Sequence, residues 1–477
     1  MNEDPLSPEE LPPLLVDQLG PYLSRRRWYA GDGPPTSLAV LGSGCLAEVG
    51  GTSRLLWAIV EAAGSQYQLV IAERPAADAA RHLQGHEDAL IGVVGDRVYY
   101  GATIDSEMAT ALLRAASGGL EDAERARRLD AEQSNTSLVY DDRLILKLFR
   151  RLSPGPNPDV EVTEALAQTG FGHIALPLVR WQRNGHDLAF GQQYLAGGTD
   201  GWALGLTSLR DFYEIATSDS PSSPALSGGD FAAEAFRLGQ MTGDMHLAMA
   251  EAFGVSVRGL AVGWPVLLAS IEARVSRLGP ELAGSAKPLL ARLEAVRDPG
   301  PAVRAHGDYH LGQVMRSDTG WYVLDFEGEP SRPLEERQRP TSALKDVAGM
   351  LRSLHYAAHF ALRERDQMDA ADLWPLARAW EDRNGAAFLR GYYDTKWIED
   401  LLPPAAADRE AVRLAYEVDK ALYELAYEQA FRPDWVPIPL AGLQRLLSEP
   451  VDMLLAGPSE RADVDEADEQ PGIQPGM

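Results

Sequence analysis

The sequence has one cysteine, few basic residues relative to acidic ones, and no long hydrophobic run. Cys45 stands alone among 477 residues, which excludes an intrachain disulfide and any metal cluster built on several thiolates. The chain carries 44 Lys and Arg against 70 Asp and Glu, and a net charge of −26 argues against nucleic acid or an anionic membrane as a partner. No segment approaches the roughly eighteen apolar residues that a membrane-spanning helix needs. The start, Met1-Asn2-Glu3-Asp4, lacks the basic and apolar parts of a signal peptide, so we expect a cytoplasmic protein.

One pair of segments carries most of the functional information. Asp308, within His306-Gly307-Asp308, is followed after five residues by Gln313 and after seventeen by Asp325. A eukaryotic-like kinase arranges its catalytic loop and metal site in this order. Phosphoryl transfer needs a carboxylate that orients the attacking hydroxyl and accepts its proton, and oxygen ligands for Mg²⁺. Either segment alone also fits a turn or a strand end, but the spaced pair predicts Asp308 as the catalytic base and Gln313 with Asp325 as the metal ligands.

A lysine in an apolar strand suggests the nucleotide-binding half. Residues 137–140 and 143–149 read as two strands joined by a turn, and Lys147 lies in the middle of the second. An ammonium group there is costly unless it meets an anion, although some strand lysines only extend to the solvent at an edge. Together with the catalytic loop, this pattern predicts that Lys147 contacts the α- and β-phosphates of ATP. A helix beginning at Asn157 offers Glu161 or Glu164 as its partner, and we favour Glu161.

Two further segments are candidates for nucleotide contacts. Residues 132–137 occupy the place of a phosphate-covering loop but contain neither a GxGxxG nor a Walker A pattern, so an ordinary polar hairpin is an equal alternative. Small polar residues there can direct backbone N–H groups at phosphates. A strand over 187–195 leads into Gly197-Gly198, which suggests an interlobe hinge whose backbone holds the adenine edge. The predicted nucleotide contacts in these segments are Ser134, Asn135, Thr136, Ser137, Gln193 and Leu195.

The acceptor site is predicted on a helix from Tyr416 to Phe431. Glu417, Lys420 and Glu424 follow one stripe of this helix at three- and four-residue steps. Carboxylates and ammonium groups hydrogen-bond sugar hydroxyls, so we predict these three residues, with Asp308, as substrate contacts. A solvated face of ion pairs is the alternative.

The first 120 residues differ from the rest. Short apolar runs alternate with turn-forming residues, which predicts a small β-rich unit ending in a helix over 106–116. The cluster Arg25-Arg26-Arg27-Trp28-Tyr29 fits an interdomain latch better than a ligand site.

With these motifs in place, the chain resembles the actinobacterial maltokinases, which are related to aminoglycoside phosphotransferases. The resemblance implies an α+β, two-lobed, eukaryotic-protein-kinase-like fold with an extra N-terminal cap domain. It also implies ATP-dependent phosphorylation of maltose to maltose 1-phosphate, on the way to glycogen and other α-glucans, with Mg²⁺ as the cofactor. The segments that carry it are Leu23 to Gly31, Ala131 to Ser137, Asn157 to Glu161, His306 to Val314, Asp325 to Pro330, Asp346 to Gly349 and Tyr416 to Lys420.

Alternatives remain at this point. Close relatives of this family phosphorylate glucosamine at its 6-hydroxyl, and residues 33–119 and 429–431 depart from the maltokinase pattern. An antibiotic phosphotransferase, or a nucleotide-binding pseudokinase that acts as a scaffold for a glycan enzyme, is a further reading. We expect a monomer, with association with a trehalose- or maltose-converting enzyme left open. The expected parts are a cap domain (1–120), an N-lobe (121–198), a helical C-lobe (199–456) and a disordered acidic tail (457–477).

Overall fold

The computed structural model describes most of the chain as two compact units. Unit 1 comprises residues 1–164 and 175–197, and unit 2 comprises residues 165–174 and 198–477. Ser134 and the predicted acidic tail lie outside the described residues. The structure describes residues 11–129, 135–183, 185–216, 224–226, 229–329, 332–363 and 370–448.

The first part of unit 1 is a β-sheet in the order β1-β2-β3-β5-β4, with three helices. The apolar runs noted in the sequence lie in its strands β2, β3 and β5, and the helix expected over 106–116 is α3. Asp105 starts this helix by accepting hydrogen bonds from the amides of Glu107 and Met108. The elements are α1 (Pro13–Leu23), β1 (Leu38–Val49), β2 (Ser53–Ala62), β3 (Ser65–Pro75), α2 (Ala76–Leu83), β4 (Leu90–Val94), β5 (Arg97–Gly101) and α3 (Ser106–Ala116).

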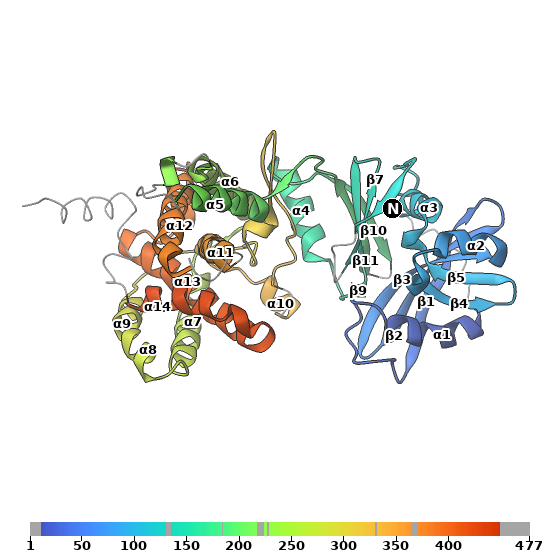
Figure 1. Cartoon of the computed structure of the whole chain (residues 1–477), viewed down its shortest axis with the longest axis horizontal. Coiled ribbons are helices and arrows are strands. Elements are labelled where there is room, and N and C mark those ends of the chain that lie inside the picture. The colour runs from blue at the N-terminus through green and yellow to red at the C-terminus, as the bar shows by residue number, and fades with distance from the viewer. Residues whose placement is uncertain are drawn as a thin grey trace, which may run out of the picture. The chain divides into compact units, whose positions relative to one another are not determined.

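A second antiparallel sheet follows in unit 1, in the order β10-β11-β8-β7-β6 (Figure 1). The turn between β7 and β8 is formed by Asp141 and Asp142, both with positive φ, as the sequence predicted. In β8, Leu144, Leu146 and Leu148 alternate inward, while Lys147 faces the other side. The elements are β6 (Ala126–Arg128), β7 (Asn135–Tyr140), β8 (Leu144–Phe149), β9 (Arg151–Leu152), α4 (Pro158–Thr169), β10 (Pro177–Arg183) and β11 (His186–Gln193).

The two sheets of unit 1 share one hydrophobic core. Trp57 of β2 and Leu112 of α3 pack in the same cluster as Leu146 of β8 and Trp181 of β10. The short strand β9 also pairs with β3. The predicted cap domain and N-lobe therefore pack as one body.

The basic-aromatic cluster joins these two parts of unit 1, as expected for a latch. Arg26 binds Asp88 at 3.1 Å, and Trp28 packs on Tyr67 in β3. The guanidinium of Arg150, which directly follows β8, lies 5.7 Å from the centre of the Trp28 ring. Burial lowers the pKa of Arg150 to about 10, so this side chain remains charged at neutral pH and is held by the aromatic face.

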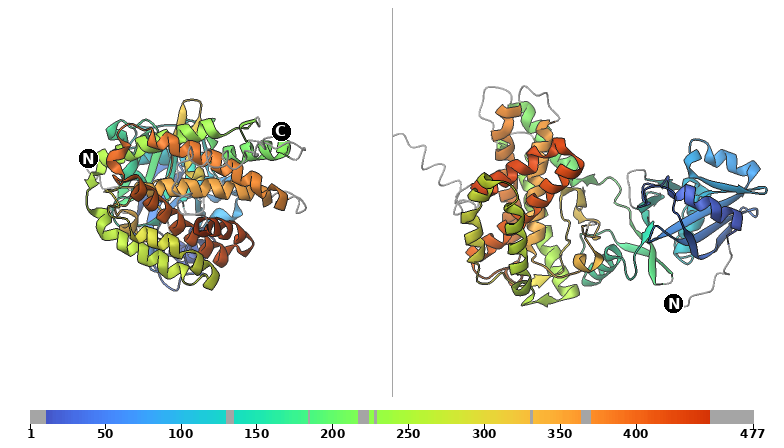
Figure 2. Two further views of the ribbon diagram at one scale, coloured as in Figure 1. Left: turned by 90° about the vertical axis from the view of Figure 1, so that its left-hand side faces the viewer. Right: turned by 90° about the horizontal axis from the view of Figure 1, so that it is seen from below.

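Unit 2 is a set of packed helices with two small antiparallel sheets. Figure 2 shows its long helices, coloured from green to red, gathered into one bundle. Among the described residues, no helix has the length and apolar character needed to cross a bilayer. The helices of four or more residues include α5 (Gly201–Ala216), α6 (Ala232–Phe253), α7 (Gly259–Val275), α8 (Pro280–Ser285), α9 (Lys287–Glu294), α10 (Leu334–Arg337), α11 (Leu344–Arg363), α12 (Ala370–Tyr393), α13 (Ala406–Phe431) and α14 (Pro437–Ser448). The strands are β12 (Thr199–Asp200), β13 (Val255–Ser256), β14 (Ala302–Val303), β15 (Val314–Ser317) and β16 (Gly320–Val323).

Helices α6 and α12 approach closely because each has a glycine where it meets the backbone of the other helix. A β-carbon on Gly239 would lie 2.0 Å from the carbonyl oxygen of Phe388, and one on Gly391 would lie 2.0 Å from that of Phe236. A side chain at either position would push the two helices apart.

We expect Gly239→Ala to lower the free energy of unfolding by about 3 kcal/mol. The added methyl group would meet the backbone of α12, which cannot move aside as the end of a flexible side chain can. Gly263→Ala in α7 is the control, since its β-carbon would meet nothing within 4 Å. That change should raise stability by about 0.5–1 kcal/mol through lower chain entropy. Urea unfolding measures both, and equal effects of the two substitutions would contradict the close approach.

Candidate active site

A buried carboxylate holds the predicted catalytic loop in place. Asp346, in the first turn of α11, accepts hydrogen bonds from the backbone amides of His306 at 2.7 Å and Gly307 at 2.9 Å. His246 of α6 approaches the same carboxylate at 3.1 Å. Three partners satisfy a group that would otherwise be costly to bury. The loop is therefore fixed to α11 immediately before Asp308.

The charge of Asp346 is maintained by these partners. Burial alone would raise the pKa of this carboxyl, but the hydrogen bond and positive charge of His246, with the amide of Gly307, hold the pKa below its usual range. Gly349, one turn along α11, allows the loop to approach, because a β-carbon there would lie 2.6 Å from the carbonyl oxygen of Tyr309. Both residues belong to the segment Asp346 to Gly349 that contributes to the family resemblance, but the sequence alone predicts no role for either of them.

Asp308 faces an ammonium group from the predicted acceptor helix. Its Oδ1 lies 3.1 Å from Nζ of Lys420 on α13, and its Oδ2 lies 4.0 Å from Nε2 of His310. Burial would raise the pKa of Asp308, but the charges of Lys420 and His310 lower it below the ordinary value. The pKa of Lys420 is raised, because Asp308, Glu424 and Glu329 outweigh the effect of burial. Asp308 is therefore an ionised carboxylate at neutral pH, able to orient a hydroxyl.

The predicted metal ligands lie next to each other. The amide Nε2 of Gln313 donates to Oδ2 of Asp325 at 3.4 Å, which leaves the amide oxygen of Gln313 facing elsewhere. Asp325 adopts a φ of 60°, a left-handed conformation that costs energy in a non-glycine residue and recurs at functional sites. A carboxylate and an amide oxygen are hard donors that suit Mg²⁺. The donor set therefore fits the ion that kinase chemistry requires.

His306 connects the catalytic loop to the metal-binding segment. Its Nε2 lies 3.0 Å from the carbonyl oxygen of Leu324, directly before Asp325. The ring packs between Tyr309 and Phe326, with centroid distances of 5.3 and 5.0 Å. The positions of Asp308 and Asp325 are thus coupled through one imidazole.

A small cavity opens beside Asp308 within unit 2. Its volume is about 20 Å³, which is room for one polar substituent and not for a whole sugar ring. Four carboxylates and three cations line it, and two of the carboxylates, Asp419 and Asp346, are also bound from outside the lining by Arg274 and His246. The lining groups are Asp308, Glu329, Asp346 and Asp419 against Arg332, Lys345 and Lys420.

Two of these carboxylates are positioned by neighbours. Arg332 donates to Glu329 at 2.8 Å, and Tyr423 also hydrogen-bonds it. Burial would raise the pKa of Glu329, but Tyr423 and Arg332 keep it below the usual range. Arg274 of α7 pairs with Oδ1 of Asp419. Glu329 was not among the acceptor residues predicted from the sequence, and Asp419 was considered there only as an acid that would favour glucosamine if it lay beside Asp308.

The predicted stripe on α13 divides into different roles. Lys420 lines the cavity, and its role as a substrate contact remains a prediction. Glu417 is 5% exposed and pairs with Arg413 on the same helix, and Glu424 binds Arg352 of α11 at 2.7 Å. Neither glutamate lines the cavity, so their predicted acceptor role has no support in this geometry. The alternative of a solvated face is also wrong, because these ion pairs are largely buried.

In unit 1, Lys147 pairs with an acid of α4 that we had not chosen. Its ammonium lies 3.4 Å from Oδ2 of Asp159, which is almost fully buried. The predicted helix start is correct, since Asn157 accepts a hydrogen bond from the amide of Asp159 at 2.9 Å. The pairing of Lys147 with Glu161 remains a prediction, and Asp159 is the ion-pair partner that the structure gives.

The predicted phosphate loop is shorter than expected, because Asn135, Thr136 and Ser137 belong to strand β7. Their amides are thus placed by strand pairing, and the hydroxyl of Thr136 accepts from Arg150 at 2.9 Å. At the predicted hinge, the amide of Gln193 donates to the carbonyl of Leu176 at 2.8 Å and is not available to adenine. No backbone hydrogen bond of Leu195 is found among the described residues, so both its groups remain candidates for the adenine edge.

Comparison with known families agrees with this geometry. Residues 22–105 match the maltokinase N-terminal cap domain, and residues 125–328 match the phosphotransferase enzyme family. A glucosamine kinase of Mycolicibacterium smegmatis is 29% identical over 337 residues, covering 68% of this chain and 80% of the relative. A glucosamine kinase of Streptacidiphilus jiangxiensis is 28% identical over 352 residues, covering 68% of this chain and 74% of the relative.

Solved structures share the fold at low sequence identity. A glucosamine kinase in complex with glucosamine, ADP and inorganic phosphate matches with a TM-score of 0.64 and 22% identity over 91% of this chain and 98% of that chain. A second crystal form of a glucosamine kinase gives 0.66, with 22% identity over 91% and 99% of the two chains. These matches confirm the predicted kinase-like α+β fold with an extra N-terminal domain. The chain therefore combines a segment similar to the maltokinase N-terminal cap domain with one similar to the phosphotransferase enzyme family.

Proposed function

We propose that the protein is an ATP-dependent sugar kinase whose acceptor is glucosamine, phosphorylated at its 6-hydroxyl. The carrying observation is the cavity beside Asp308, which is the size of one substituent and is lined by the carboxylates of Glu329 and Asp419 as well as that of Asp308. A protonated amine would form charge-assisted hydrogen bonds with these carboxylates, and such bonds are stronger than those of a neutral hydroxyl. The relatives described above are named as glucosamine kinases, which supports the same choice.

In this proposal Asp308 orients the acceptor hydroxyl and accepts its proton as the phosphoryl group transfers. Lys147 holds the α- and β-phosphates of ATP, and Asp159 keeps its ammonium in position. Asp325 and the amide oxygen of Gln313 would hold Mg²⁺, which neutralises phosphate charge when bound. Lys420 keeps Asp308 ionised and fixes its orientation.

Maltose is the second candidate, and the match of residues 22–105 to the maltokinase cap domain favours it. A disaccharide needs a longer cleft with a platform for its second ring, and it presents an anomeric hydroxyl. The carboxylates of the cavity favour an amine over a neutral hydroxyl, so we rank maltose below glucosamine.

A panel of acceptors tests the choice directly. ADP release should be fastest with glucosamine, slower with glucose and maltose, and absent with aminoglycosides, because only glucosamine fills the charged cavity. Phosphorus NMR should find the product phosphate on C6. An anomeric phosphate on maltose, formed with the higher kcat/KM, would replace glucosamine by maltose.

The same panel of acceptors, measured with the variant Asp419→Asn, tests the contribution of one carboxylate charge in the cavity, because this substitution removes the charge and nearly keeps the size of the side chain. This change should raise the KM for glucosamine by a factor on the order of 10, because one carboxylate facing the amine is lost. The KM values for ATP and for glucose should change less than about twofold. An equal loss with glucose and glucosamine would remove Asp419 from amine recognition.

Asp308→Asn should cut kcat by a factor on the order of 10² or more while ATP still binds, because only the proton acceptor is lost. Asp318→Asn, at an exposed position in the β15–β16 turn, is the matched control and should keep full turnover. Titration of a fluorescent ATP analogue and steady-state kinetics give both quantities. A variant Asp308→Asn within a few-fold of the parent would end the assignment of Asp308 as the base.

Lys420→Met should shift the acid limb of the kcat/KM profile to higher pH. In the parent protein the lowered pKa of Asp308 keeps the carboxylate ionised down to below its ordinary value of 3.8. Without the lysine, burial dominates and raises this pKa, so protonation removes the base at a higher pH. A profile with an unmoved acid limb and a uniformly lower rate would mean that Lys420 only binds substrate.

A further inference from the structure

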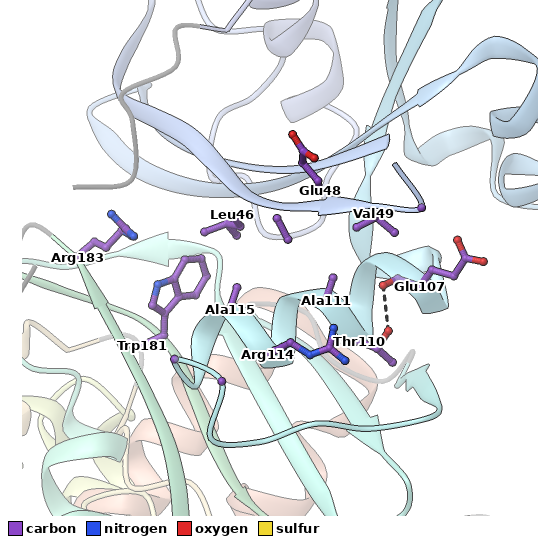
Figure 3. Close-up of a pocket in the computed structure, with 14 residues that line it drawn as sticks. Leu46, Glu48, Val49, Glu107, Thr110, Ala111, Arg114, Ala115, Trp181 and Arg183 are labelled. Atoms are coloured by element: carbon purple, nitrogen blue, oxygen red, sulfur yellow. Dashed lines mark hydrogen bonds between the residues drawn. The ribbon is translucent and has the colours of Figure 1, made fainter. Parts of the chain in front are cut away.

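A second cleft lies wholly within unit 1, and none of its lining residues belongs to the candidate active site. Its volume is about 540 Å³, within the roughly 300–1,000 Å³ of small-molecule pockets. The end of β1, one face of α3 and the end of β10 form its walls (Figure 3). It therefore joins the part of unit 1 matched to the cap domain and the sheet of the phosphotransferase domain.

The cleft is left open by small side chains on α3. Met108 and Leu112 turn one face of this helix into the core, whereas Ala115 faces the cleft, Ala111 lies between the core and the cleft, and Gly118 lines the cleft just after the helix ends. Opposite them, the pairing of β1 with β2 shifts register between Cys45 and Ala47, so that Leu46 is a bulge residue. Bulges redirect side chains and often border binding sites.

Trp181 offers the cleft a hydrogen-bond donor. Its side chain is 6% exposed, and in Figure 3 the indole rises from β10 toward β1. Among the described residues, no group accepts a hydrogen bond from the indole N–H, and this nitrogen is not one of the enclosed unpaired ones, so it is open to the cleft. An acceptor from a ligand would complete this site.

The charges of the cleft cancel. Two carboxylates and two guanidinium groups line it, and two of these four are already paired: Glu107 with Arg74 at 2.6 Å, and Arg114 with Asp122 at 2.7 Å. The guanidinium of Arg183 lies 4.9 Å from the centre of the Trp57 ring. A phosphorylated ligand would prefer excess positive charge and an amine excess negative charge. Polar groups at the rim and an apolar floor instead fit an uncharged molecule with one apolar face.

We propose that this cleft binds a neutral, unphosphorylated saccharide of one or two rings, at a site separate from the acceptor site. The apolar face of the ring lies against Ala111, Ala115 and Leu46, and a hydroxyl oxygen accepts from the indole of Trp181. Thr110 at the rim supplies a further polar contact, whereas the carboxylate of Glu48 points away from α3 in Figure 3. Because the cleft bridges both sheets of unit 1, its occupant stabilises their packing.

The test measures binding of glucose, maltose and maltotriose to the full-length protein by calorimetry, with glucosamine and glucose 6-phosphate as charged counterparts. Ala115→Leu fills the cleft and should abolish binding of the neutral sugars while the KM of the acceptor stays within twofold. Trp181→Phe keeps the ring but loses the donor, and should weaken binding at least fivefold. Ala77→Leu on the exposed face of α2 is the matched control and should leave binding unchanged.

Each other outcome overturns the proposal. Neutral-sugar binding that survives Ala115→Leu belongs to the acceptor site. Tighter binding of glucose 6-phosphate that is lost in Ala115→Leu would make the ligand an anion. If none of the neutral sugars binds at a concentration of about 10 mM, the cleft is not a site for neutral saccharides. The proposal does not depend on the identity of the acceptor, which the kinetic panel decides separately.

Discussion

The buried carboxylate of Asp346 is the interaction on which the active site depends. It binds two consecutive loop amides and His246 at once, so the loop, α6 and α11 are fixed relative to one another. Removing such a group leaves buried donors without partners, which costs more than the bond itself contributes. His306 then transmits the position of this loop to Leu324 and the metal segment. The positions of Asp308 and of the segment that carries Asp325 thus follow from one buried carboxylate with all its hydrogen-bond partners.

The sequence was most informative where the chemistry is local. A short loop separates Asp308 from Gln313, and a hairpin separates Gln313 from Asp325. The sequence separation of these residues therefore nearly determines how far apart they lie in space. The sequence could not select the partner of Lys147, because Asp159 and Glu161 both lie in the first turn of α4. Which of them approaches the strand depends on how the helix is rotated against the sheet. That rotation is decided by tertiary packing, not by helical spacing.

The acceptor helix shows the same limit more strongly. Charges at helical spacing look alike in sequence, but Glu424 is occupied by Arg352, which is 72 residues away along the chain. The residues that line the cavity with Lys420 include Glu329 and Asp419, which come from a loop and from the adjacent face of the helix. An acidic residue between apolar residues indicates a carboxylate that will be buried and must find partners. Asp346, in Leu344-Lys345-Asp346-Val347-Ala348, shows this pattern in the sequence.

The first 120 residues are an integral part of the nucleotide-binding unit. A boundary near residue 120 follows from composition, yet β9 pairs with β3, and Arg150 packs on Trp28 across that boundary. Since the two sheets share one core, a change in the packing of β1 or α3 is felt by β10 and by the strands beside it. Lys147 lies on β8, which is separated from β10 only by β11. A ligand between α3 and β10 would therefore act on the same sheet that positions Lys147.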